Sequence, residues 1–113
     1  MKLNTVYSCA LAASLMVLSS GAAVAGGDED KGKELSATCA ACHGADGNST
    51  IPTNPTLAGQ YESYLVQALQ DYRSGARQNA IMAGFAAALS DQDIRDLAAY
   101  FSNQDSELEI LDR

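Results

Sequence analysis

Histidine, methionine and positive charge are scarce in this sequence. It contains one histidine, three methionines and seven basic residues against 14 acidic ones. Because Lys2 is the one basic residue before position 26, residues 26–113 carry a formal charge of −8. This charge argues against nucleic acid and anionic membrane surfaces as partners, since both are negative themselves. It either favours a partner protein with a basic patch or simply keeps the protein soluble.

Two of the three cysteines and the one histidine form the most specific motif, Cys39-Ala40-Ala41-Cys42-His43-Gly44. Two thiols three residues apart, followed directly by an imidazole, are typical of covalent haem c attachment. On one helical turn both sulfurs can bond to the same porphyrin edge, while the imidazole turns toward the iron. The motif therefore predicts one haem c per chain, attached through Cys39 and Cys42 and ligated by His43.

Other uses of the cysteine pair fit the sequence less well. A structural zinc site needs four ligands, and beyond this motif only Cys9 remains. A thioredoxin-like redox pair is expected beside a βαβ pattern, and no strand pattern lies near the motif. A disulfide between residues three apart closes a very small loop and adds little stability.

Met82 is the candidate for the second axial ligand of the haem iron. No other histidine exists, Met1 starts the chain, and Met16 lies in an expected leader. A His/Met pair raises the reduction potential and suits electron transfer, whereas an open iron face suits the binding or activation of small molecules. The alternative is that Met82 merely fills the core, which leaves the second iron face to another group.

Residues 1–25 resemble a secretory signal peptide. Lys2 precedes an apolar stretch from about Val6 to Leu18, and small residues end in Ala23-Val24-Ala25. We therefore expect cleavage before Gly26 and export to the periplasm. An uncleaved membrane anchor remains an alternative, because no charge lies between residues 3 and 25. Residues 26–113 are enough for one small domain, with a core of about 28–104 and a tail of 105–113.

Three segments follow the period of an amphipathic helix, which predicts an all-α fold. The first runs from about Glu29 to Ala41 and the second from about Tyr61 to Ser74. The third follows Ser90, whose spacing from Asp93 resembles a capping box, and ends near 102–104. The segments between them, 46–60 with both prolines and 76–89 with Met82, are expected to close over the two haem faces.

The second predicted helix carries an apolar stripe that is either ordinary core or a wall of the haem pocket. Beyond it, Arg77 either pairs with a haem propionate or is solvated, and for Arg73 we favour solvation. Residues 105–113 are either a docked turn or a frayed tail. The stripe consists of Tyr61, Tyr64, Leu65, Ala68, Leu69 and Tyr72.

Together these features resemble a class I c-type cytochrome, similar to small bacterial single-haem cytochromes and to one half of the two-haem bacterial type. The resemblance covers about 28–104. It rests on Gly32, the motif at 39–44, Pro55, and the segments Leu57–Gln60, Asn79–Met82 and Leu89–Ile94.

This resemblance implies a small cytochrome c fold, thioether bonds from Cys39 and Cys42, and axial ligation by His43 and Met82. It also implies that the Pro55 carbonyl accepts a hydrogen bond from His43. The first and last helices should touch, with Gly32 and Leu35 near Leu97, Tyr100 and Phe101. Relatives often carry proline where this chain has Ala80 and Gly84, so the methionine segment is expected to be looser here.

The expected function is that of a soluble periplasmic electron carrier of the respiratory chain, not an enzyme, whose iron cycles between Fe(II) and Fe(III). Its partners would be redox proteins, namely a quinol-oxidising complex upstream and a terminal oxidase or reductase downstream. It would bind no small-molecule substrate and would reach the membrane only through partners. The alternatives are a ligand-binding or peroxide-reactive haem protein with a labile Met82, or the haem subunit of a larger redox complex.

Overall fold

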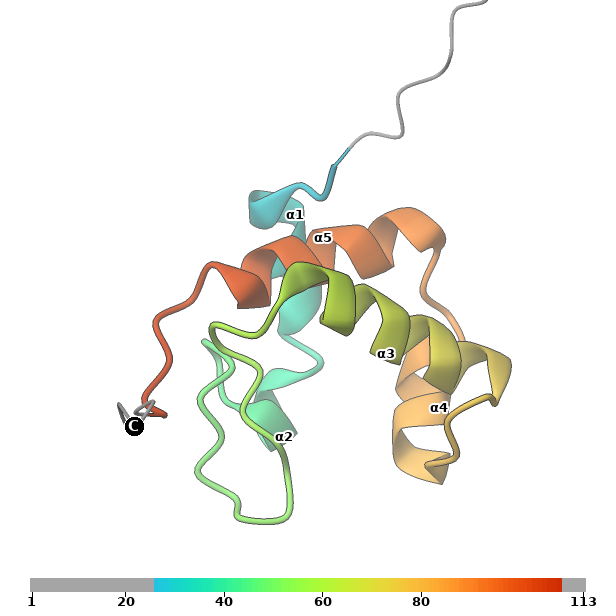
Figure 1. Cartoon of the computed structure of the whole chain (residues 1–113), viewed down its shortest axis with the longest axis horizontal. Helices are drawn as coiled ribbons and strands as arrows, with labels where there is room; N and C mark the ends of the chain where they lie inside the picture. Colours follow the sequence, from blue (N-terminus) through green and yellow to red (C-terminus); the bar gives the residue numbers. More distant parts are fainter. Residues whose placement is uncertain (1–25, 109–113) are drawn as a thin grey trace, which may run out of the picture.

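Residues 26–108, which the computed structural model describes, form five helices and contain no strand (Figure 1). This arrangement confirms the expected all-α fold. The predicted signal peptide at 1–25 and residues 109–113 lie outside the described residues. Within 26–108, no helix has both the length and the apolar character needed to cross a membrane. The helices are α1 (Glu29–Ser36), α2 (Ala40–His43), α3 (Glu62–Ser74), α4 (Ala80–Ala86) and α5 (Asp91–Ser102).

Helix α5 is the centre of the fold, and α1 and α3 both pack against it. Its N-terminus has the predicted capping box, in which the Ser90 hydroxyl and the Asp93 carboxylate each bind the other residue's backbone N–H. Residues of α3 and α5 share one apolar cluster, against which Leu35 of α1 also packs. The buried members of this cluster are Leu65, Leu97, Ala98, Tyr100 and Phe101.

The contact between α1 and α5 depends on a glycine. A Cβ atom on Gly32 would lie 2.0 Å from the carbonyl oxygen of Asp96 and 2.7 Å from the Cβ of Tyr100, so no side chain fits there. The buried Asp96 carboxylate also accepts a hydrogen bond of 2.7 Å from the backbone N–H of Asp28. The predicted packing of the first helix on the last helix is confirmed.

The first predicted helix, Glu29 to Ala41, is wrong in its length. Helix α1 ends at Ser36, and a turn at 37–39 separates it from α2. The hydroxyl of Ser36 donates to the carbonyl oxygen of Lys33, and that of Thr38 donates to Leu35. Such side-chain bonds compete with the helical ladder and explain the break. The attachment motif consequently lies on its own short helix, α2.

The segment 76–89, expected to be a loop, contains helix α4. Asn79 caps it, because its side-chain oxygen accepts from the backbone N–H groups of Ile81 and Met82. Gly84 lies inside this helix, where a proline would interrupt it, whereas Ala80 holds the first position, where proline is tolerated. Met82 therefore lies in the first turn of a helix that packs against α3.

The start of the tail is docked on the loop that follows α2. The buried side chain of Asn48 donates to the carbonyl oxygen of Asp105 and accepts from the backbone N–H of Glu107, both at 2.9 Å. Of the two alternatives for the tail, the docked turn holds for residues 105–107.

Candidate cofactor site

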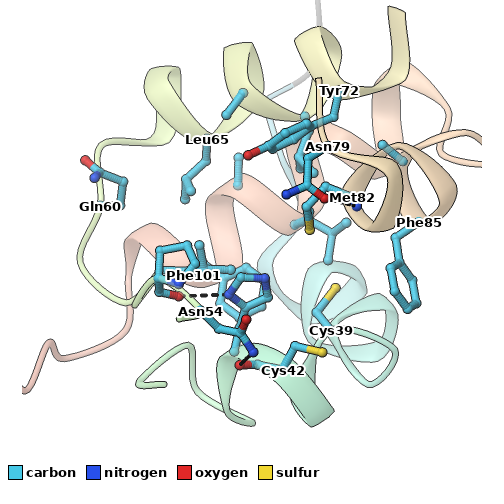
Figure 2. A pocket seen from close by; sticks show the side chains of 18 of the residues that line it. Cys39, Cys42, Asn54, Gln60, Leu65, Tyr72, Asn79, Met82, Phe85 and Phe101 are labelled. Carbon is cyan, nitrogen blue, oxygen red and sulfur yellow. Dashed lines mark hydrogen bonds between the residues drawn. The ribbon is translucent and has the colours of Figure 1, made fainter. Parts of the chain in front are cut away.

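A cavity of about 300 Å³ lies among α2, α3, α4 and the loop 46–60, with α5 at its back (Figure 2). This volume lies at the lower end of the range of about 300–1,000 Å³ that is typical of small-molecule and cofactor sites. All four predicted site residues line it: Cys39, Cys42, His43 and Met82. Residues that are far apart in the sequence are thus brought to one cavity.

His43 is buried, and its ring is held in one orientation. The Nδ1 atom lies 2.8 Å from the carbonyl oxygen of Pro55, as predicted. Because a carbonyl can only accept, Nδ1 carries the hydrogen and Nε2 keeps its lone pair free. A histidine fixed in this way is ready to bind a metal through Nε2.

The backbone of the attachment motif is held by the same loop. The side-chain amide of Asn54 donates to the carbonyl oxygen of Cys42 at 3.0 Å (Figure 2), and the hydroxyl of Ser49 lies 3.2 Å from that oxygen. The composition of 46–60 predicted a loop, but nothing in the sequence indicated that Asn54 and Ser49 would bond to Cys42. Together with Pro55 they attach the loop to Cys42 and to His43 of α2, a segment that we call the histidine turn.

Cys39 and Cys42 are both half-buried free thiols. Burial, the largest effect, raises the pKa of the Cys39 thiol above its ordinary value, and the hydroxyl of Thr38, 3.9 Å from the Cys39 sulfur, opposes this rise. In Figure 2 the two sulfur atoms lie together along one side of the cavity. Their arrangement suits two bonds to one edge of a planar group.

Met82 reaches the cavity from α4, on the other side from Cys39 and Cys42 in Figure 2. Its backbone N–H donates to the Asn79 cap at 3.0 Å, which fixes the start of the helix that carries it. The half-buried thioether is directed into the cavity.

The chemistry of the lining residues fits a haem. Leu65, Leu97 and Phe101 form apolar walls, an imidazole nitrogen and a thioether sulfur reach in from separate elements, and two thiols lie at one edge. Among the described lining residues, Arg77 is the one with a permanent charge, and its sign is opposite to that of haem carboxylates.

The apolar stripe of α3 forms one wall of this cavity. Every member of the stripe lines it except Tyr61, which is 80% exposed. Leu65 also belongs to the core cluster and Leu69 packs against it, so these two residues serve both as core and as pocket wall.

The expectation that Arg73 is solvated is wrong, since its guanidinium donates to the carbonyl oxygen of Leu89 at 2.9 Å and pairs with Asp91. Both partners lie more than a dozen residues away, so the local sequence gave no sign of them.

The chain is similar to known cytochromes. A model of the cytochrome c family matches residues 29–105. The chain is 50% identical over 84 residues to cytochrome c4 of Pseudomonas aeruginosa, covering 74% of this chain and 42% of that protein. It is 44% identical to cytochrome c-554(548) of Halomonas halodenitrificans, covering 70% of this chain and 99% of that protein.

More distant relatives and a solved structure extend this picture. The cytochrome subunit of sulfide dehydrogenase from Chlorobaculum tepidum is 37% identical, with 66% of this chain and 67% of that protein covered. The crystal structure of reduced recombinant cytochrome c4 from Pseudomonas stutzeri matches with a TM-score of 0.69 and 45% identity, over 73% of this chain and 48% of the other. The chain thus spans about half the length of the cytochrome c4 proteins that it matches.

Proposed function

This chain belongs to the cytochrome c family, and from that membership we propose that it is a periplasmic electron carrier with one haem c held between His43 and Met82. Members of the family carry covalently attached haem c, and Cys39 and Cys42 fit its attachment motif. When bound, the haem supplies one-electron chemistry between Fe(II) and Fe(III). The observation that carries the proposal is the meeting of two thiols, an oriented imidazole and a thioether in one cavity.

The protein's part in this function is to hold both ligands in place in each redox state. The Pro55 carbonyl keeps the hydrogen on Nδ1 of His43, which leaves Nε2 to bind. The Asn79 cap holds the helical turn that carries Met82. Because each ligand is supported by its own element, a change in iron charge requires little movement, and a His/Met pair gives a high reduction potential.

Cys39 and Cys42, which would hold one edge of the haem, are half-buried at one side of the cavity, so electrons would enter and leave beside them. Most side chains that line the cavity are apolar or uncharged, among them Phe85, which is 50% exposed. No acidic residue lines the cavity in the part of the chain that the structure describes. The charge of −8 on residues 26–113 steers partners with basic patches from a distance, and contact at the uncharged edge brings them close to the haem.

The proposal also includes the location of the protein and its redox partners. Residues 1–25 serve as a signal peptide, and 26–113 function in the periplasm as one domain. The carrier takes electrons from a quinol-oxidising complex and delivers them to a terminal oxidase or reductase. It transforms no small-molecule substrate itself.

A second candidate is a haem subunit or dedicated electron acceptor of a dehydrogenase. Some relatives bear such names, namely the cytochrome subunit of sulfide dehydrogenase already described and a thiosulfate dehydrogenase electron acceptor from Thiomonas intermedia. In this role the same site accepts electrons from one enzyme to which it is bound. Purification of the exported protein without overproduction distinguishes the two, since a subunit elutes with its enzyme.

The absorption spectrum of the oxidised protein tests the ligand pair. Methionine bound to ferric haem gives a weak band at long wavelength, which should be present in the natural protein and absent from Met82→Ala. Carbon monoxide should bind slowly to the reduced natural protein and rapidly to the variant. A natural protein without the band that takes up carbon monoxide at once would instead be a ligand-binding haem protein.

A further inference from the structure

Arg77 lies between α3 and α4 and makes three contacts back to α3. Its Nη1 atom donates to the hydroxyl of Tyr64 at 3.2 Å, and its guanidinium carbon lies 4.8 Å from the centre of the Tyr72 ring. Its backbone N–H donates to the carbonyl oxygen of Asp71 at 3.1 Å. We call Arg77, Tyr64 and Tyr72 the arginine clasp.

The arginine clasp combines two interactions that suit a guanidinium. The planar group stacks on an aromatic ring while its N–H groups donate at the edge, which the ammonium of lysine cannot do in the same way. The hydrogen bond with Tyr64 raises the pKa of Arg77 further above its ordinary value, so the cation is permanent. The clasp therefore joins the 75–79 turn to two positions on α3.

Helix α4, which begins three residues after Arg77, has few other attachments. Among the described helices it packs mainly against α3. Its outer face is open to solvent, since Ile81 is 68% exposed and a Cβ atom on Gly84 would meet nothing within 4 Å. Helix α4 contains a glycine and no proline, so the stiffness of its own backbone does not hold Met82 in place.

We propose that Arg77, gripped by Tyr64 and Tyr72, is a positioning residue that fastens α4 to α3 and so keeps the Met82 sulfur inside the cavity. This inference rests on the proposed His43/Met82 ligand pair. It differs from a purely electrostatic role, in which Arg77 only balances a haem carboxylate. In that case the tyrosine contacts have no effect on Met82.

The exchange of Met82 for imidazole on the oxidised, haem-loaded protein tests the clasp. At saturating imidazole the exchange rate is limited by departure of the methionine. Loss of an exposed charged hydrogen bond and its ring contact should speed this step about fivefold in Arg77→Gln. Tyr64→Phe keeps the arginine charge and the fold but loses the hydrogen bond, and it should speed the step about twofold. The double variant should equal Arg77→Gln alone, because both changes remove the same contact.

Lys31→Gln is the matched control. It removes the same charge from α1, where Lys31 pairs with the exposed Glu34 instead of lining the cavity. Its imidazole exchange rate should equal that of the natural protein. The long-wavelength band of methionine should remain in all four variants, which separates a faster departure of Met82 from a failure to fold.

Three outcomes overturn the clasp. The first is an unchanged rate in Arg77→Gln. The second is a faster imidazole exchange in Arg77→Gln with an unchanged rate in Tyr64→Phe and additive effects in the double variant. This result would mean that the arginine acts through its charge alone. The third is an exchange rate in Lys31→Gln that rises as much as in Arg77→Gln, which would mean that the net charge of the protein sets the rate. A natural protein that lacks the methionine band overturns the ligand pair itself, and the clasp with it.

Discussion

The Nδ1 atom of His43 lies 2.8 Å from the carbonyl oxygen of Pro55, twelve residues further along the chain. The loop that carries this oxygen is also tied to the histidine turn by the bond from Asn54 to Cys42. The turn and the loop therefore form one hydrogen-bonded unit, and its parts should respond together when one bond is removed.

We expect Asn54→Ala to weaken this unit. The substitution leaves the carbonyl of Cys42 without its amide donor, and loss of such a half-buried bond should lower the free energy of unfolding by about 1 kcal/mol. Urea titration of the haem-loaded protein measures the change. Asn103→Ala is the control, since that amide donates only to the exposed Glu29, and its effect should stay within about 0.5 kcal/mol. An equal loss in both variants would refute the role of Asn54.

We expect glycine-to-alanine substitutions at Gly32 and Gly84 to change stability in opposite directions. Gly32→Ala forces a Cβ atom to within 2.0 Å of the Asp96 carbonyl, so α1 must move off α5 and stability should fall by about 3 kcal/mol. Gly84→Ala adds a Cβ atom into open space within α4 and should raise stability by about 0.5–1 kcal/mol. Thermal unfolding of the two variants beside the natural protein checks both signs. A loss of stability in Gly84→Ala would show that α4 is packed more closely than described.

Local patterns were sufficient for much of this fold. The attachment motif, the capping box at Ser90 and the stripe of α3 are set by residues within a few positions of one another, so the sequence revealed them. The break after Ser36 and the helix at Asn79 also have local causes, but these depend on which side-chain oxygen bonds to which backbone group. The partners of Arg73 and Asn48 are distant in the chain, and only the folded structure brings them together.

Asn48→Ala should release the residues that follow α5. The buried amide satisfies the backbone of both Asp105 and Glu107, and its removal should cost about 1–3 kcal/mol. Hydrogen exchange of the Glu107 amide is the direct measurement, and it should become fast in the variant. Fast exchange at Glu107 in the natural protein would contradict the docked turn.

Stability should fall in acid below about pH 4. Hydrogen bonds hold the pKa values of three carboxyl groups below the ordinary 3.8, those of Asp46 through Asn48, Asp91 through Arg73 and Asp93 through Ser90. Because these values are lowered in the folded state, the stabilisation is complete above the unfolded pKa and is lost as the pH falls through the folded one. Urea titrations from pH 7 to 3 should therefore give a level region and then a decline.

Asp93→Asn isolates one of these groups. The variant should be less stable than the natural protein at pH 7, because the capping box loses its carboxylate. The difference between the two should shrink as the pH falls, since the natural carboxyl group is then protonated. A difference that is the same at pH 7 and pH 3 would contradict the assignment of the shift to the capping box.

Mass spectrometry of the exported protein, denatured in acid, tests the central claim most directly. We predict a mass equal to residues 26–113 plus one haem, and a mass without haem for the variant with Cys39→Ser and Cys42→Ser. Denaturation removes every non-covalent cofactor, so retained haem must be bonded to the chain. A coloured natural protein whose denatured mass is that of the polypeptide alone would contradict the attachment of haem through Cys39 and Cys42.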